Sequence, residues 1–204
     1  MRGTLKALFA AMLLVLPLAA CGINTIPTKQ ERARAAWADV QSQYQRRADL
    51  IPNLVSTVQG YARQEREVLR QVTEARASAT QVRIDASTLT DPEAFRRYQE
   101  AQNQLSGVLG RLLAITENYP ELRSSQNFLA LQSQLEGTEN RIAVARRDYN
   151  EAVRSYNTEL RTFPGVIWKG ILYGASEPMQ MFEAQGGAEQ APSVSFDSGA
   201  APAP

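Results

Sequence analysis

The chain has 204 residues, a length that suits one folded domain with tails. Its 44% hydrophobic and 21% charged residues are ordinary for a globular protein, and its 22 Lys and Arg against 21 Asp and Glu lack the basic excess of nucleic-acid-binding proteins. No histidine and one cysteine exclude a histidine-based zinc site, a cysteine-rich metal cluster, an internal disulfide and a Ser-His-Asp or Cys-His catalytic unit. We therefore expect a protein that is not an enzyme and that binds no cofactor.

The N-terminus has the features of a secretion signal. Arg2 and Lys6 precede an apolar run over residues 7–20, which is shorter than the roughly 17–25 residues of a membrane-spanning helix. The run ends in Leu18-Ala19-Ala20-Cys21-Gly22, which resembles a bacterial lipobox. We predict that residues 1–20 are a lipoprotein signal peptide and that Cys21 carries acyl chains such as palmitate. The alternative is an uncleaved anchor in which the cysteine is incidental.

Lipidation would hold the protein firmly at a membrane. Each buried CH₂ group contributes about 0.8 kcal/mol, and one acyl chain alone anchors only marginally, whereas a lipobox cysteine carries a diacylglyceryl group. We expect a lipid-anchored protein of the bacterial cell envelope, exposed outside the cytoplasm, with residues 21–28 as a short linker. Gly22, where Asp would favour retention, indicates the periplasmic face of the outer membrane if the host has two membranes.

A long helical segment follows over residues 29–82. Apolar or small residues recur there mostly at steps of three or four, the spacing of one helix face. They are Trp37, Val40, Tyr44, Ala48, Ile51, Val55, Val58, Ala62, Leu69 and Val72. Pro52 lies inside the segment, where it removes a backbone donor and clashes with the carbonyl of Ala48. We therefore expect a kink near residues 49–53, at which the segment either folds back or projects beyond the other helices.

Two further helices and a short apolar segment complete the body. The second helix should begin at Asp91 and Pro92, a cap followed by a first-turn proline, and end at residues 118–120. The third should begin near Ser124 or Ser125 and keep a heptad pattern up to Phe163. Residues 166–173 form a short helix that either caps the other helices, which we favour, or contacts lipid.

The last residues are rich in Gly, Ala, Pro and Ser, so we predict a flexible tail over residues 175–204. The predicted fold is all-α. It is an elongated antiparallel helical bundle of long helices, of the four-helix-bundle type, over residues 29–174.

Three blocks of the sequence resemble the LemA family. They are Arg46-Arg47-Ala48-Asp49-Leu50-Ile51-Pro52-Asn53-Leu54-Val55 with Gly60-Tyr61-Ala62, the stretch 114–122, and the stretch 135–150 followed by Tyr156-Asn157 and Phe163-Pro164. The resemblance covers about residues 24–196. It implies a helical bundle held at a bacterial membrane, without an accepted catalytic activity. Members usually start with a transmembrane anchor, from which the lipobox departs, and one branch contributes to building magnetosome membranes, which suggests scaffolding.

The polar residues of these blocks have a functional and a structural interpretation. Arg46, Arg47 and Asp49 beside Pro52 could bind an anion or a partner, but we favour ion pairs with neighbouring helices. Glu136 and Glu139, three residues apart, could act as acid and base or bind a hard cation, but no histidine or second carboxylate motif supports either role.

Tyr149-Asn150 and Tyr156-Asn157 repeat after seven residues. The tyrosines should bury their rings along the helix seam, and the asparagines should set its register; a row of ligand-binding residues is the alternative. We expect a structural role for the remaining motif residues: Asn53, Glu117, Asn118, Tyr119, Pro120, Asn140 and Arg141.

The sequence therefore favours a non-enzymatic scaffold of the cell envelope. Its expected partners are the membrane, through the lipid anchor, and other envelope proteins, with no nucleic acid; the heptads allow homo-oligomers. A membrane-shaping or lipid-binding bundle is the second hypothesis, in which residues 166–173 enter lipid. A carboxylate-dependent hydrolase that uses Glu136 or Glu139 is the third.

Overall fold

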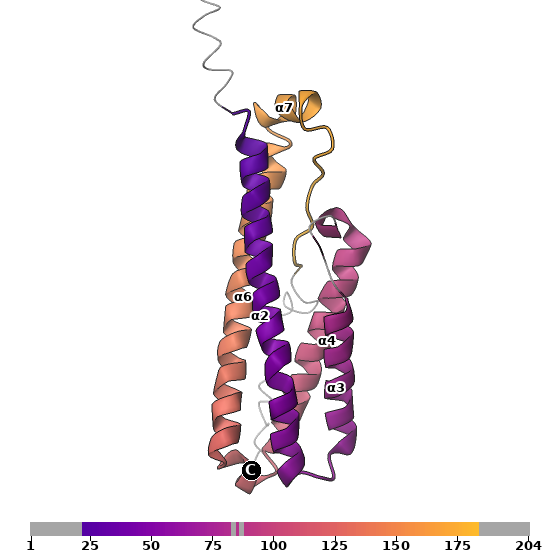
Figure 1. The fold of residues 1–204 in the computed structure, drawn as a ribbon, viewed down its shortest axis with the longest axis vertical. Coiled ribbons are helices and arrows are strands. Elements are labelled where there is room, and N and C mark those ends of the chain that lie inside the picture. The colour runs from indigo at the N-terminus through magenta and orange to yellow at the C-terminus, as the bar shows by residue number, and fades with distance from the viewer. Residues whose placement is uncertain (1–21, 83–84, 86–87, 184–204) are drawn as a thin grey trace, which may run out of the picture.

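The computed structural model describes residues 22–82, 85 and 88–183 (Figure 1). These residues are helical for most of their length and contain no β-strand, as the all-α prediction requires. The predicted signal peptide and Cys21 lie outside the described residues, as do residues 184–204.

Two long helices, α2 (Thr25–Tyr61) and α6 (Gln126–Glu159), lie side by side along the molecule (Figure 1). With 37 residues, α2 is about 55 Å long at a rise of 1.5 Å per residue. It begins at Thr25, so the predicted linker over residues 21–28 is too long: residues 25–28 form the first turn of α2.

The other helices are α3 (Arg66–Gln81) and α4 (Pro92–Thr116), which pack together beside α2. Three short elements join the long ones: η1 (Thr88–Thr90), α5 (Pro120–Arg123) and α7 (Gly165–Ile171). As predicted, the Asp91 carboxylate caps α4 and accepts hydrogen bonds from the backbone N–H groups of Glu93 and Ala94, at 2.9 and 3.1 Å.

The segment predicted as helical over residues 29–82 does fold back, but the predicted place of the turn is wrong, because it lies at residues 62–65 and not at Pro52. The chain leaves α2 after Tyr61 and returns as α3 from Arg66, while Pro52 lies inside α2 without ending it. The physical reason is burial, because a straight helix would leave the apolar face of its second half in water. Folding back packs Leu69 and Val72 into one cluster with Ile51, Leu54 and Val58.

Two apolar clusters fill the interior, one in each half of the molecule. The first is aromatic and centres on Trp37, whose ring lies 5.3–6.0 Å from the rings of Phe95, Tyr98, Tyr149 and Phe182. The second is mostly aliphatic and contains residues of α3, the C-terminal part of α2, the C-terminal part of α4, α5 and the start of α6. The interior of the molecule therefore consists of an aromatic half and an aliphatic half, one after the other along the long axis.

A segment without helix over residues 172–183, which begins with turns, completes the aromatic half. Met179 and Phe182 are 3% and 6% exposed and belong to the aromatic cluster. The predicted flexible tail is thus wrong for residues 175–183. The α3 helix packs in the aliphatic cluster and ends at Gln81, so the aromatic half lacks a fourth long helix, and this segment covers it.

Among the described residues, no helix combines the length and the apolar character that crossing a bilayer requires.

Candidate functional site

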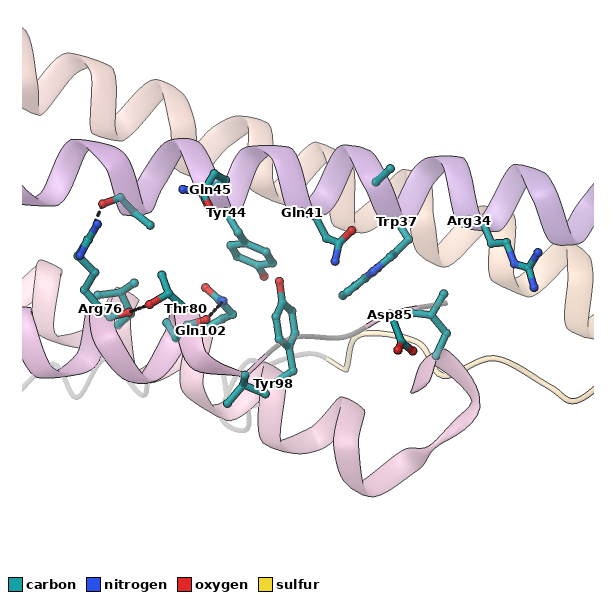
Figure 2. Close-up of a pocket in the computed structure, with 16 residues that line it drawn as sticks. Arg34, Trp37, Gln41, Tyr44, Gln45, Arg76, Thr80, Asp85, Tyr98 and Gln102 are labelled. Carbon is teal, nitrogen blue, oxygen red and sulfur yellow. Dashed lines mark hydrogen bonds between the residues drawn. The ribbon is translucent and has the colours of Figure 1, made fainter. Parts of the chain in front are cut away.

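A lateral cavity of about 770 Å³ opens between α2 and the α3–α4 pair (Figure 2). Its wall includes the aromatic side chains of Trp37, Tyr44 and Tyr98 and the amides of Gln41 and Gln102. The Tyr44 and Tyr98 side chains point toward one another, with ring centroids 5.7 Å apart (Figure 2). The cavity is thus lined by aromatic rings and neutral hydrogen-bonding groups as well as charged ones.

Burial keeps the two phenols of this cavity in their neutral form. Removal from water raises the pKa of Tyr44, although the positive charges of Arg146 and Arg47 oppose the rise. The same cause, removal from water, raises the pKa of Tyr98 further. Near neutral pH both hydroxyls therefore act as hydrogen-bonding groups and carry no charge.

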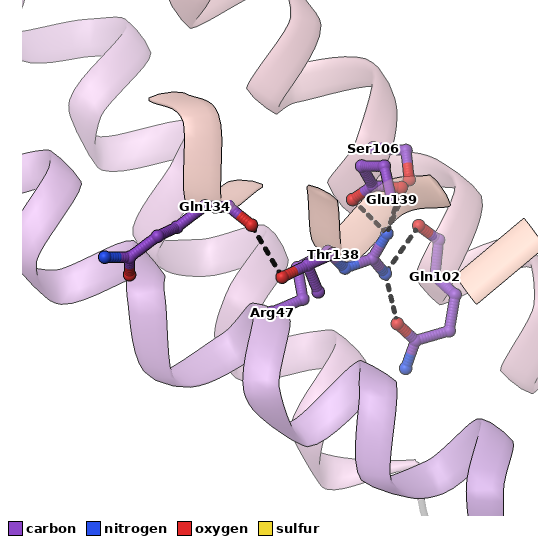
Figure 3. A network of polar contacts seen from close by, with 6 residues as sticks. All are labelled: Arg47, Gln102, Ser106, Gln134, Thr138 and Glu139. Atoms are coloured by element: carbon purple, nitrogen blue, oxygen red, sulfur yellow. Dashed lines mark hydrogen bonds and ion pairs between the residues drawn. The ribbon is translucent and has the colours of Figure 1, made fainter. Parts of the chain in front are cut away.

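Arg47 on α2 forms the centre of a polar layer between the two apolar clusters (Figure 3). Its side chain is 1% exposed, and Nη1 donates to Ser106 Oγ at 2.6 Å and to Glu139 Oε1 at 3.1 Å. Nη2 donates to the side-chain oxygen of Gln102 and, at 3.3 Å, to its backbone carbonyl. One guanidinium therefore joins α2, α4 and α6.

Gln102 extends this layer to the fourth long helix. Its side-chain Nε2 donates to the carbonyl of Ala79 on α3 at 3.1 Å. A buried charge is costly unless it is paired and hydrogen-bonded, so sliding one helix by a turn would leave Arg47 unpaired. The layer thereby fixes the register of the helices, which is the structural interpretation of this motif.

The other residues around Pro52 do not join the layer. Arg46 and Asp49 are exposed, and Asp49 accepts a hydrogen bond from Gln45 on its own helix, at 2.8 Å. The backbone carbonyl of Asn53 accepts from the Thr57 hydroxyl. Of the three charged residues predicted as one group, the structure brings only Arg47 into the interior.

The two glutamates considered as acid and base have separate partners. Glu139 binds Arg47, while Glu136 is exposed and accepts a hydrogen bond from Gln132 Nε2 at 3.0 Å. Three or more potential metal ligands do not cluster anywhere within residues 22–82, 85 and 88–183.

The second family block lies at the end of the molecule where α5 connects α4 to α6. The Tyr119 hydroxyl donates to Glu65 at 2.7 Å and accepts from Gln64 Nε2 at 2.8 Å, which ties this connection to the turn between α2 and α3. Glu117 is exposed and pairs with Arg123 at 2.9 Å. Asn118 is exposed, and Pro120 begins α5.

Asn150 and Asn157 hold the extended C-terminal segment. Asn157 donates to the carbonyl of Met179 and accepts from its N–H group, both at 2.9 Å. Asn150 makes the same pair of bonds, both at 2.9 Å, with Phe182. Gln99 on α4 repeats the pattern with the backbone of Glu183, at 3.1 and 3.3 Å. We call these three side chains the amide clamp.

Further contacts fix the clamped segment in place. The Tyr149 hydroxyl donates to the Gln180 carbonyl at 2.8 Å, and Gln180 N–H donates to the Leu89 carbonyl at 2.8 Å. The guanidinium of Arg146 lies 4.4 Å from the centre of the Phe182 ring. The Tyr156 hydroxyl is buried beside Ser176 of the same segment.

The seam next to Tyr149 and Tyr156 is therefore occupied by the chain itself. Sequence reasoning missed this segment, although Met179, Met181 and Phe182 stand out in a stretch of small and polar residues. Asn140 and Arg141 of the same block are exposed, and Arg141 bonds to Gln43 on α2 and to Thr138.

The short helix α7 lies at the end of the molecule where α2 begins (Figure 1). Its Gly165 is buried against the end of α6, and Trp168 packs against the aromatic cluster, so it partly caps this end. Phe163, Val166, Ile167, Ile171 and Leu172 are nevertheless exposed.

Comparison with known proteins gives one family and several relatives. The pattern of the LemA family matches residues 36–196. Magnetosome protein MamQ 2 of Paramagnetospirillum magneticum is 26% identical over 157 residues, covering 69% of this chain and 58% of the relative. Protein LemA of Metamycoplasma hominis is 25% identical over 140 residues, covering 69% and 60%. The chain thus spans about three fifths of the length of these curated relatives.

Proposed function

The chain belongs to the LemA family, and on that premise we propose that it is a lipid-anchored protein of the bacterial cell envelope with a non-enzymatic scaffold role. Its relatives suggest membrane association, and the lipobox-like stretch at Cys21 supplies an anchor. The finer architecture in this proposal is an antiparallel bundle of the four-helix type, built on α2, α3, α4 and α6.

The short distance between Cys21 and the folded helices is the observation that carries the proposal. Residues 22–24 alone separate Cys21 from α2. At no more than about 3.6 Å per residue, such a linker would keep α2 within about 15 Å of the acyl chains. The helices would then stand on the membrane and present their sides to other envelope proteins.

The contacts of the two glutamates support a role without catalysis. A general base needs a free carboxylate within reach of a substrate proton, whereas Glu139 is bound by the buried Arg47. Glu136 is exposed and accepts a hydrogen bond from its helix neighbour Gln132. The two carboxylates that the hydrolase hypothesis requires therefore do not act on a common point.

The anchor is tested by growing cells with an alkyne-bearing palmitate and comparing the wild-type protein with Cys21→Ser. We expect the wild type alone to be labelled and to fractionate with membranes. Equal labelling of both proteins, or none, would contradict the lipid anchor.

The scaffold role is tested by crosslinking both proteins in living cells and identifying the crosslinked peptides by mass spectrometry. We expect envelope proteins that crosslink reproducibly to the sides of α2 or α6 in the wild type and are lost with Cys21→Ser. A wild-type sample without reproducible partners would argue against a scaffold.

The exposed apolar side chains around α7 favour a second candidate, a bundle that shapes membranes. The MamQ relatives are named magnetosome proteins. Addition of the lipidated protein to giant vesicles should then produce tubules or buds. Spherical vesicles at full surface coverage would leave the scaffold as the better proposal.

A further inference from the structure

One face of α7 and its flanking residues is apolar and exposed. Phe163 is 79% exposed and Ile171 68%, while Val166, Ile167 and Leu172 are 45–53% exposed. Ile167 and Ile171 are four residues apart in α7, so they share one side of the helix, and Phe163 lies just before the helix begins. We call these five residues the apolar foot. Folded proteins seldom leave so many large apolar side chains together in water without a partner for them.

The opposite face of α7 is packed firmly, which fixes the direction of the foot. Gly165 approaches the end of α6 so closely that an added Cβ would lie 2.1 Å from the Glu159 carbonyl oxygen. Trp168 packs against the aromatic cluster. The foot is therefore a rigid surface and not the exposed side of a loosely attached helix.

The foot lies next to the predicted lipid anchor. An added Cβ on Gly22 would lie 3.2 Å from Pro164 Cγ and 3.5 Å from Trp168 Nε1, so the chain passes close beside α7. Cys21 is the residue before Gly22. The α7 helix lies at the end of the molecule where α2 begins (Figure 1). Acyl chains on Cys21 would therefore enter the bilayer beside the foot.

Charge at this end also suits a membrane surface. Residues 160–176 contain Arg161 and Lys169 but no Asp or Glu, and Glu177 follows directly after this range. The adjoining Glu159 is paired with Lys29. A short helix with an apolar face and flanking cations is typical of segments that lie in the interface of a bilayer with anionic lipids.

We infer that the apolar foot inserts into the leaflet that holds the acyl chains of Cys21, as a second contact between the protein and the lipid. The inference rests on the lipid anchor proposed above and adds to it. A diacylglyceryl group alone leaves the helices free to tilt and rotate. The foot gives the molecule two contact points and holds α2 and α6 upright on the membrane.

The test places an environment-sensitive nitrobenzoxadiazole dye on the foot of the lipidated full-length protein. Because the lipid blocks Cys21, Ile171→Cys supplies the one free thiol for the dye. The matched control is Leu129→Cys, since Leu129 is an apolar residue 51% exposed near the other end of α6. Each protein is reconstituted into vesicles of phosphatidylethanolamine and phosphatidylglycerol that carry lipids with a nitroxide quencher on the acyl chain.

We expect a blue-shifted emission and strong quenching for the dye at residue 171, and neither effect at residue 129. A protein that floats with the vesicles but is not quenched at residue 171 overturns the foot and leaves the anchor standing. A protein that does not float overturns the anchor and the foot together. A blue shift without quenching, which disappears when the protein is diluted in lipid, assigns the foot to contact with a second copy and also overturns the inference.

A second measurement uses Ile167→Asp together with Ile171→Asp. Both side chains are exposed, so the thermal unfolding midpoint should change little, and Leu129→Asp is the control. We expect the double variant to keep its anchor but to lose the blue shift of a dye attached at Leu172→Cys. Unchanged emission of that dye would contradict insertion.

Discussion

Arg76 on α3 donates a hydrogen bond from Nε to the backbone carbonyl of Ala48 on α2, at 2.8 Å (Figure 2). This carbonyl would normally accept from the N–H group four residues later, but that residue is Pro52, which has none. A side chain of a neighbouring helix thus replaces the missing bond within α2. Because Pro52 leaves the Ala48 carbonyl without a donor in its own helix, this carbonyl is free to bind Arg76 and so connects α2 to α3.

This relationship predicts a coupling between Arg76 and Pro52. Arg76→Ala should lower the free energy of unfolding by about 2 kcal/mol, since it removes a bond from a charged donor to a half-buried acceptor. In a Pro52→Ala background the helix can supply its own donor, so the same substitution should cost less. Urea unfolding of the four proteins of the cycle measures the difference.

The control for this cycle is Arg97→Ala, which removes an exposed arginine from α4. It should change the free energy of unfolding by less than about 0.5 kcal/mol. Equal losses for Arg76→Ala with and without Pro52 would show that the two residues act independently.

The amide clamp predicts that asparagine side chains stabilise the extended segment. Asn150→Ala removes both bonds to the Phe182 backbone and should lower the free energy of unfolding by about 1–3 kcal/mol. It should also speed amide hydrogen exchange at residues 179–183. Asn140→Ala, on an exposed position of the same helix, is the control and should leave both quantities unchanged. Equal exchange in the two variants would mean that the clamp does not hold the segment.

The polar layer predicts opposite outcomes for the two neighbouring glutamates. Glu139→Gln leaves the buried Arg47 without its carboxylate and should cost about 1–2 kcal/mol of unfolding free energy. Glu136→Gln changes an exposed side chain and should cost less than about 0.5 kcal/mol. Chemical denaturation of the two variants distinguishes them. If a folded Glu136→Gln variant failed to replace the wild-type protein in cells, the hydrolase hypothesis would be supported again.

The buried tyrosines predict loss of stability at alkaline pH. Burial raises the pKa of Tyr44, Tyr98, Tyr149 and Tyr156 above the ordinary value of 10.0. Above about pH 10 the unfolded chain loses these protons before the folded one does. The contribution of these tyrosines to the free energy of unfolding should therefore be constant below about pH 10 and fall above it.

Absorbance at 295 nm and far-UV circular dichroism, followed together during an alkaline titration, check this prediction. The buried tyrosines should ionise in the same step in which the helices unfold. Ionisation of every tyrosine near pH 10 with the helices intact would contradict it.

The start of α4 and the all-α class were predictable because their signals are local. Asp91 and Pro92 cap and open α4 through contacts within three residues. The heptad stripe of α6 likewise identifies its buried face, from Phe128 to Tyr156, since periodicity alone shows which side is apolar.

The features that the sequence did not predict depend on distant partners. Residues 62–65 contain no strong helix breaker, and the turn there is favoured only because α3 can bury its apolar face on α2. In the amide clamp, Asn157 and Asn150 of α6 bind backbone groups that lie 22 and 32 positions further along the chain. Gln99 binds a backbone group 84 positions further along. A single sequence shows the asparagines but not the backbone that they bind.

The place of Phe182 in the aromatic cluster makes the order of synthesis matter. Trp37 and Phe95 are made early, yet the Phe182 ring that packs against both comes from almost the last of the described residues. A chain that stopped before residue 179 would expose several aromatic rings, the kind of surface that chaperones and proteases recognise. The fold thereby distinguishes a full-length product from a truncated one, and only the former closes its own interior.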